Sequence, residues 1–600
     1  MNQKSKRRTS LTALFAAGLL AVAGCSSGGG GGGGASPSAE GQPVKGGTLN
    51  LLGAGDVDYA DPNVSYYSLG QQVLRLWSRQ LFSNPAIEGK TTTAAPDIAT
   101  ELPTMENGGI SKDGLTYTIH MRRGVKWNTT PARDVTAEDV VRGVKRTCNP
   151  AQPFGGLPDF QTLIAGFDAF CQGFAKVKAT PAEIEKYINE NDVTGLQAKD
   201  DYTMVFKLTH PATYFTSMLT MNAFSPAPEE GLKYLPGSTE YGQNAIASGP
   251  YKIDSWTPTK SFKFSRNPAW DPKTDPIRKA YVDKIVINET VTQESTQQQL
   301  QTGTASADMS FGNFPPPSVL PGLIASKDPQ LALGPTDSSN PYIVFNTISP
   351  NNGNALQDVK VRQALEYGIN RDNIIQVLGG PQTNTPLSHV LPKGIQGSQD
   401  IDLYPYNVDK AKSLLKDAGK SGLTLKLLYR SSSEGNRKTF ATVQQDLSKV
   451  GIKVTGVASP DADFYTKYLQ NPSAAKNGVW DLALAGWGPD WFGNAALSYF
   501  GPLFNGKAAF PPVGSNFGFY ENPTTESLIE KASTSTDLQT SLGAWADADR
   551  QVMEDAVFFP ITDPKQALYH AKQVHNTILM SGIQGFDPTN VWLDSNMQGG

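Results

Sequence analysis

The sequence predicts an α/β protein with several domains, and three observations support this fold class. The chain has 600 residues, more than one hydrophobic core normally organises. Its composition, 38% hydrophobic and 18% charged, is that of an ordinary globular protein, and no internal apolar run reaches membrane-spanning length. Finally, residues 113–146 combine the pattern of a strand with that of a helix, which is the basic unit of an α/β fold.

The strand is predicted from strict alternation. One face carries apolar side chains and the other polar ones; the apolar set is Leu115, Tyr117, Ile119 and Met121. This period of two indicates a half-buried strand, which Gly124 ends. Thr136 can then cap a helix, with Asp139 three residues later as the reciprocal acid of a capping box.

The N-terminus predicts export. Four basic residues precede an apolar run over residues 11–22, followed by Ala23, Gly24 and Cys25. Residues 1–24 therefore form a predicted signal peptide. Residues 22–25 resemble a bacterial lipobox, which implies that Cys25 carries lipid; the alternative is an ordinary signal peptide with a chance cysteine. Residues 25–45 contain seven consecutive glycines and are predicted to be a flexible linker.

Charge and histidine usage argue against two classes of protein. After residue 24 the chain has 48 basic and 56 acidic residues and no basic block, so nucleic acid is not an expected partner. Its five histidines form no H-E-x-x-H motif, and there is no G-x-S-x-G elbow. We therefore expect neither an enzyme nor a metal or other cofactor.

Further motifs occur along the chain in a fixed order. Residues 248–270 read as a hairpin, residues 342–347 as a strand, residues 358–375 as a core helix, and residues 403–419 as a helix that Gly419 ends. In the core helix the recurring apolar positions are Val359, Val361, Ala364, Leu365 and Gly368. Together with residues 113–146, these segments resemble the extracytoplasmic solute-binding proteins of family 5, the oligopeptide- and dipeptide-binding lipoproteins of peptide-type ABC importers, in an actinobacterial-like form.

The resemblance covers nearly all of residues 46–596 and implies a two-lobed fold like that of periplasmic binding proteins, in the class with an extra domain. Mixed sheets are joined by two crossover strands, near residues 342–347 and 558–561, which would act as a hinge. Lobe I is then expected to contain residues 46–95, 211–340 and 560–600, the extra domain beside it residues 96–210, and lobe II residues 341–559.

Two cysteines remain in the exported body. In an oxidising compartment Cys148 and Cys171 favour a disulfide. A metal site is the less favoured interpretation, because no histidine or second cysteine pair lies at ligand spacing.

The candidate ligand site is the segment 482–494, where an apolar strand runs into a Gly- and Pro-rich turn. Trp487 and Trp491 bracket Asp490, and an acid partly desolvated by aromatic rings is suited to pair with an ammonium group. In peptide-binding members of the resembling family, an Asp three residues after a Trp holds the peptide's amino group. The alternative is that Asp490 only accepts backbone hydrogen bonds in a turn.

A second candidate segment lies early in the chain. The resemblance implies that Ser65, Tyr66 and Tyr67 line the ligand cleft, although the two tyrosines could equally be packing residues. The predicted function is capture of extracellular oligopeptides between the lobes and delivery to the permease of an ABC importer. The protein is expected to be a monomer, held on the outer face of the cell membrane only through Cys25. The alternative is the same fold binding an oligosaccharide or another small solute.

Overall fold

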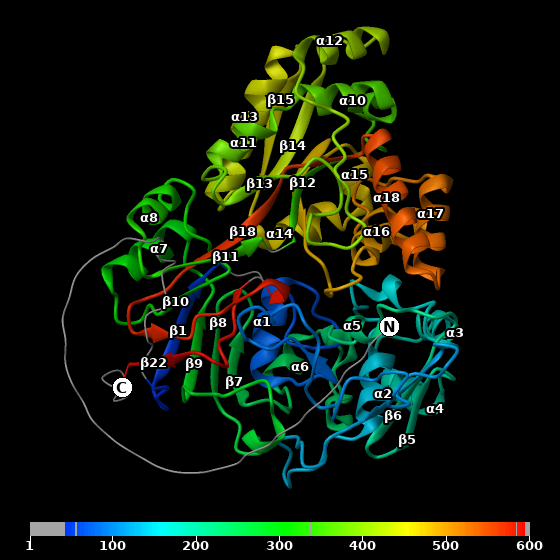
Figure 1. Cartoon of the computed structure of the whole chain (residues 1–600), viewed down its shortest axis with the longest axis vertical. Helices are drawn as coiled ribbons and strands as arrows, with labels where there is room; N and C mark the ends of the chain where they lie inside the picture. The colour runs from blue at the N-terminus through cyan, green and yellow to red at the C-terminus, as the bar shows by residue number, and fades with distance from the viewer. Residues whose placement is uncertain (1–41, 55–56, 337, 584, 595–600) are drawn as a thin grey trace, which may run out of the picture. The chain divides into compact units, whose positions relative to one another are not determined.

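The computed structural model describes residues 42–54, 57–336, 338–583 and 585–594 (Figure 1). The predicted signal peptide, Cys25 and most of the predicted linker lie outside these residues. Within the described residues, no helix has both the length and the apolar character that crossing a membrane requires.

The first large sheet is mixed and has the strand order β10-β1-β9-β8-β7. Strand β1 pairs in parallel with both β9 and β10, while β7, β8 and β9 are antiparallel. The predicted hairpin at residues 248–270 corresponds to β7 and β8. The strands are β1 (Thr48–Gly53), β7 (Tyr251–Thr257), β8 (Ser261–Arg266), β9 (Lys284–Asn288) and β10 (Met309–Phe311), and the helices nearby are α1 (Ser68–Trp77), α6 (Thr239–Gln243), α7 (Gln293–Thr302) and α8 (Leu320–Ser326).

A smaller antiparallel sheet, of order β4-β6-β5, forms the centre of residues 116–207. The predicted strand and capped helix are confirmed, because Thr136 and Asp139 form the capping box of α2. The elements are β4 (Thr116–His120), α2 (Ala137–Arg146), the short helix η1 (Leu157–Asp159), α3 (Phe167–Phe174), α4 (Pro181–Glu190), β5 (Leu196–Asp200) and β6 (Thr203–Lys207), followed by α5 (Phe215–Met218).

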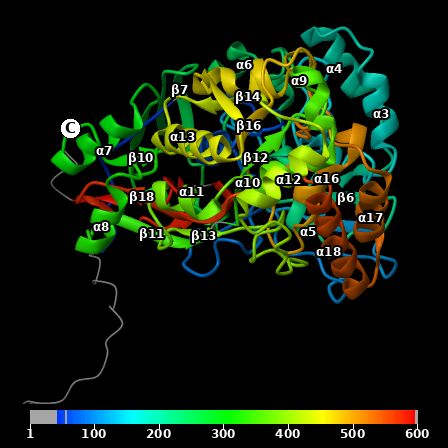
Figure 2. The ribbon, with the colours of Figure 1, turned by 90° about the horizontal axis from the view of Figure 1, so that it is seen from above.

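The second large sheet has the order β15-β14-β16-β12-β17. Its side chains alternate between two cores: Ile343 and Phe345 of β12 face the core that contains α10, α12 and α13, whereas Tyr342 and Val344 face the opposite core. Figure 2 shows α17 and α18 side by side. The strands are β12 (Asn340–Phe345), β14 (Thr424–Arg430), β15 (Lys453–Ser459), β16 (Leu482–Trp487) and β17 (Phe558–Pro560), and the helices are α10 (Val359–Gly368), α11 (Arg371–Val377), α12 (Val408–Asp417), α13 (Glu434–Lys449), α16 (Leu497–Phe504), α17 (Pro523–Thr534) and α18 (Leu538–Glu554).

The chain passes twice between the second large sheet and a separate three-stranded sheet, which agrees with the two predicted crossovers. Strand β11 (Leu331–Thr336) precedes β12, and β17 precedes β18 (Thr562–Tyr569). β11 pairs with β18 and β12 pairs with β17, both antiparallel, so the two connections run side by side. The fold is therefore the predicted α/β arrangement with two crossover strands, while the proposed lobe boundaries stay a prediction.

Two details of the sequence analysis differ from the structure. The sequence also predicts an apolar helix around residues 73–82, but the helix found there spans Ser68–Trp77, and Phe82 lies in a short strand. The backbone N–H groups of Ser248 and Gly249 both donate to the Trp77 carbonyl, which takes the acceptor that a longer helix would use. Val359 is 37% exposed rather than buried, because it is the first residue of α10.

Ion pairs stabilise the packing of residues 43–300. Arg146 on α2 donates to both carboxylate oxygens of Asp61, the shorter distance being 2.7 Å. A second group contains Arg79, Asp97, Asp275 and Arg278, whose side chains are fully buried. In both groups every buried acid has an arginine partner.

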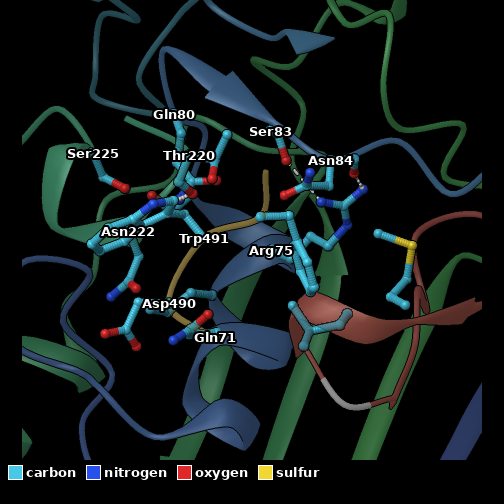
Figure 3. A pocket seen from close by; sticks show the side chains of 15 residues that line it. Gln71, Arg75, Gln80, Ser83, Asn84, Thr220, Asn222, Ser225, Asp490 and Trp491 are labelled. Carbon is cyan, nitrogen blue, oxygen red and sulfur yellow. Dashed lines mark hydrogen bonds between the residues drawn. The ribbon is translucent and has the colours of Figure 1, made fainter. Parts of the chain in front are cut away.

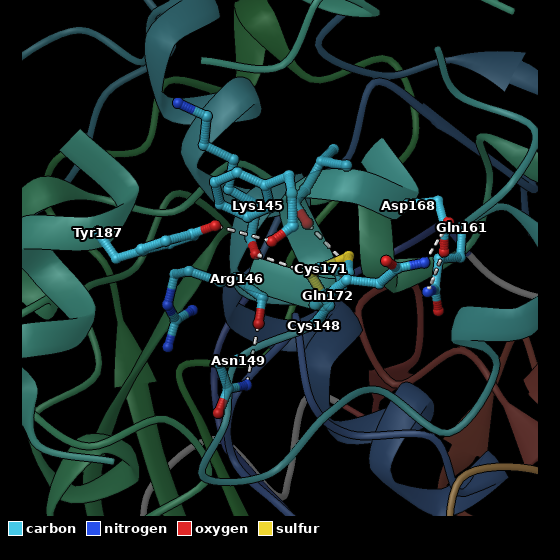
Figure 4. The surroundings of a disulfide bond; sticks show 12 residues. Lys145, Arg146, Cys148, Asn149, Gln161, Asp168, Cys171, Gln172 and Tyr187 are labelled. Atoms are coloured by element: carbon cyan, nitrogen blue, oxygen red, sulfur yellow. Dashed lines mark hydrogen bonds between the residues drawn. A yellow bond between two sulfur atoms is a disulfide. The ribbon is translucent and has the colours of Figure 1, made fainter. Parts of the chain in front are cut away.

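A disulfide joins Cys148, just after α2, to Cys171 on α3 (Figure 4). Their Cα atoms are 5.5 Å apart, and both residues are buried in the core around α2. This bond closes a loop of about two dozen residues in the part of the chain that carries η1.

Candidate functional site

A cavity of about 670 Å³ lies between elements of the two large sheets. Four of the residues singled out in the sequence line it: Tyr66, Tyr67, Trp487 and Asp490. Its lining carries both signs of charge, from Glu289, Arg430, Asp461, Asp490 and Lys565. A cavity of this size, with aromatic walls and a few charged groups, is typical of a small-molecule or peptide site.

Asp490 is positioned by a residue from a distant part of the chain, Tyr66. Asp490 lies just beyond the end of β16 and is partly buried. The Tyr66 hydroxyl donates to its carboxylate at 2.9 Å. The Tyr66 ring centre is 6.0 Å from that of Trp487, whose indole N–H donates to the Ser498 carbonyl. Residues more than 400 positions apart in the chain thus form one wall.

The turn that carries Tyr66 and Tyr67 is held by Asp58. Its carboxylate accepts hydrogen bonds from the backbone N–H groups of both tyrosines and from the Ser65 hydroxyl. Ser65 itself is fully buried and does not line the cavity. The sequence suggested Ser65 as a ligand contact, but the structure places it beneath the site, where it supports the turn.

Trp491 also lies behind the main wall. It is 1% exposed and stacks on Tyr214 with ring centres 6.1 Å apart. It lines a second cavity of about 50 Å³, to which Asp490 also contributes (Figure 3). In Figure 3 Asp490 and Gln71 lie on one side of this small cavity, while Arg75 lies on the other and donates to Ser83 and Asn84.

The structure adds an acid that the sequence analysis missed. Asp159, on the short helix η1, is 7% exposed, and its carboxyl group lies beside that of Asp490. No N–H or O–H group among the described residues donates to Asp159. Nothing in the sequence around residues 155–160 marks this aspartate, because its role depends on packing against a segment 331 residues away.

Burial raises the pKa of Asp490 to about 7, although the hydrogen bonds from Tyr66 and Asp159 act in the opposite direction. Burial, and then the neighbouring charge of Asp490, raise the pKa of Asp159 well above its ordinary value. Two adjacent carboxyl groups in a site of low polarity cannot both ionise readily, so the pair retains a proton near neutral pH.

The site can therefore hold a cationic group. A ligand ammonium at Asp490 would find an acid that has no ion pair with any described lysine or arginine, flanked by two aromatic rings. Among the described residues, histidine, cysteine and acidic side chains do not gather in threes as a metal site would need.

Comparison with known proteins gives the family. Residues 93–508, well over half of the chain, match the family described as bacterial extracellular solute-binding proteins, family 5. The chain belongs to this family. Its members serve transport as binding proteins, which at this level points away from an enzyme.

Among curated relatives, the glutathione-binding protein GsiB of Escherichia coli O1:K1 is 26% identical over 480 residues, covering 78% of this chain and 81% of that protein. Among solved structures, a clavulanic acid biosynthesis oligopeptide-binding protein has a TM-score of 0.74 at 23% identity and covers 92% of this chain and 96% of its own. The Escherichia coli murein tripeptide-binding protein MppA has a TM-score of 0.75 at 18% identity, covering 92% and 99%. These structures share the two-lobed fold.

Proposed function

We propose that this protein captures short peptides in the 670 Å³ cavity and delivers them to the permease of an ABC importer. The observation that carries the proposal is Asp490: a carboxyl group on the cavity wall, oriented by Tyr66, without a cationic partner among the described residues. Such an acid accepts a peptide's α-ammonium group.

The rest of the cavity suits the other end of a zwitterion. Arg430 and Lys565 line the same space and can attract a carboxylate. The names of the relatives, which include glutathione- and tripeptide-binding proteins, support a short peptide as ligand. We further propose that lipid on Cys25 holds the protein at the outer face of the membrane, close to the permease.

Native mass spectrometry tests the ligand class directly. The body from Ser26 onward, purified without added ligand, is expected to carry a series of masses that differ by amino-acid residues. Masses spaced by hexose units, or no ligand after incubation with peptide mixtures, would contradict the proposal and favour the sugar or other-solute alternative.

Calorimetry with tri-alanine tests the site. Asp490→Asn removes the carboxylate that would pair with the ammonium group of the ligand. The substitution is therefore expected to weaken binding of tri-alanine at least about thirtyfold. N-acetylated tri-alanine, which has no ammonium group, is expected to bind both proteins weakly. Asp461→Asn is the matched control, since Asp461 is another acid in the cavity lining, and it should retain most of the affinity. Equal losses in both variants would remove Asp490 from its assigned role.

A further inference from the structure

The second acid behind Asp490 has no obvious structural purpose. Asp159 is buried, and no described lysine or arginine forms an ion pair with it. The structure nevertheless packs it tightly: a Cβ atom on Gly501 of α16 would lie only 2.7 Å from an Asp159 carboxylate oxygen. The carboxyl group is therefore fixed against the segment that follows Asp490. Neither of its oxygens accepts a hydrogen bond from a described N–H or O–H group, and the carboxyl group of Asp490 lies beside it.

The described groups that face Asp159 and Asp490 include no cation available to neutralise the two carboxyl groups. Tyr66 faces Asp490 from the segment before α1, and Tyr214 faces Asp159 from the segment before α5; both are neutral near pH 7. Arg75, the cation that lines the small cavity behind Asp490, is paired with Asp587 at 2.8 Å. Two buried carboxyl groups side by side, with no described cation paired to either, are stabilised by a proton shared between them.

Building on the proposed peptide site, we propose that Asp159 is a positioning residue: it keeps a proton and donates it in a hydrogen bond to Asp490, which orients Asp490 as the carboxylate that receives the ligand's amino group. Tyr66 donates to Asp490 from the other side. Asp159 and Tyr66 thus act as two neutral donors that stabilise ionised Asp490. Unlike a cation, they do not compete with the ammonium group of the ligand.

The arrangement couples binding to protons. Below pH 7 Asp490 of the empty site is largely protonated, so binding of an ammonium group must release that proton to solvent while Asp159 keeps its own. Affinity for a free-amino peptide should therefore fall as the pH decreases from 7, by up to tenfold per pH unit. Above pH 8 affinity should fall again, because the peptide's own amino group loses its charge.

Two variants separate the proton from the charge. Asp159→Asn keeps a donor of the same shape, and we expect its affinity for tri-alanine at pH 7.5 to stay within about threefold of the parent protein. Asp159→Ala removes the donor and should weaken binding about tenfold or more, and move the acid limb of the pH profile to higher pH. Equal affinities and profiles in both variants, or an equal loss in both, would overturn the positioning role.

A measurement without ligand keeps this inference distinct from the proposed function. Because folded Asp159 keeps a proton that the unfolded chain loses near pH 4, the melting temperature of the empty protein should decrease from pH 5 to pH 8. Asp159→Asn, which cannot ionise, should flatten this decrease. An unchanged slope would overturn the retained proton itself. A flattened slope without tri-alanine binding would mean that the proton is present but that peptide capture, and with it the role proposed for Asp159, is wrong.

Discussion

One group of buried acids in this protein has arginine partners, whereas another has no arginine or lysine partner among the described residues. Asp97 and Asp275 lie fully buried with Arg79 and Arg278, at distances as short as 2.8 Å. Asp159 and Asp490 contact each other and a tyrosine, and no arginine or lysine pairs with them among the described residues. Arginine therefore compensates the aspartates of the first group, whereas those of the second group have no cation partner among the described residues.

The pKa values reflect the contrast. Burial of Asp275 would raise its pKa, but Arg278 and Arg79 more than offset this and lower it to about 2. For Asp490 the neutral donors Tyr66 and Asp159 offset burial only in part, and the pKa rises to about 7. A compensated acid contributes to the fold, whereas an uncompensated one on a cavity wall is available to a ligand.

The largest expected effect comes from breaking the compensated group. Arg278→Met leaves two buried carboxylates with only Arg79, and we expect the free energy of unfolding to fall by about 3–5 kcal/mol. Urea unfolding followed by tryptophan fluorescence measures the change. Arg266→Met is the matched control: Arg266 pairs with Asp283 at 2.9 Å at the surface, and its loss should cost about 1 kcal/mol or less. Similar losses in both variants would show that burial does not distinguish the two pairs.

The next largest effect is expected from disturbing Tyr66, the tyrosine that donates a hydrogen bond to Asp490. Gly155 packs on the ring of Tyr66, and a Cβ atom there would come within 2.5 Å of it. Gly155→Ala should displace Tyr66, lower the free energy of unfolding by about 1–3 kcal/mol and weaken tri-alanine binding. Gly543 on α18 has open space at the same position, so Gly543→Ala should instead stabilise the protein by about 0.5–1 kcal/mol. Unchanged binding by Gly155→Ala would show that the Tyr66 ring need not be held in place.

Sequence and structure agree where the signal is local. Alternation at residues 115–121 and the pair Thr136–Asp139 predicted a strand and a capped helix, and both are present, because hydrogen bonds within a few residues determine them. The predicted end of α1 was wrong by five residues. Backbone N–H groups of residues 248–249 bind the carbonyl that a longer helix would have used. The family resemblance supplied the two-lobed arrangement, which no local pattern contains.

The site divides in the same way. Trp487 and Asp490 could be chosen from the sequence because a strand, a sharp turn and two aromatic rings occur within ten residues. Asp159 and Asp58 could not, because one acts on a residue from another sheet and the other acts through backbone N–H groups that any turn offers. Ser65 looked like a ligand contact, but its hydroxyl is used within its own turn.

The smallest expected effect measures how much the Tyr66 hydroxyl, a neutral hydrogen-bond donor, stabilises the ionised form of Asp490. Tyr66→Phe removes the 2.9 Å hydrogen bond to Asp490 and leaves the ring. Since this bond lowers the pKa of Asp490, its loss should raise that pKa above 7 and cost more at pH 8, where the acid is ionised, than at pH 5, where it is neutral. We expect a decrease of about 1 kcal/mol in unfolding free energy at pH 8 and less at pH 5.

Tyr214→Phe provides the control for that measurement. The Tyr214 ring stacks on Trp491, and its hydroxyl makes no hydrogen bond within the described part of the chain. Its removal should therefore change stability equally at the two pH values. If Tyr66→Phe behaved in the same way, Tyr66 would not be stabilising a carboxylate, and the contrast between the two groups of acids would rest on burial alone. A pH-dependent loss confined to Tyr66→Phe would instead show that a neutral hydrogen-bond donor stabilises the ionised form of Asp490. Arginine stabilises the ionised form of Asp275.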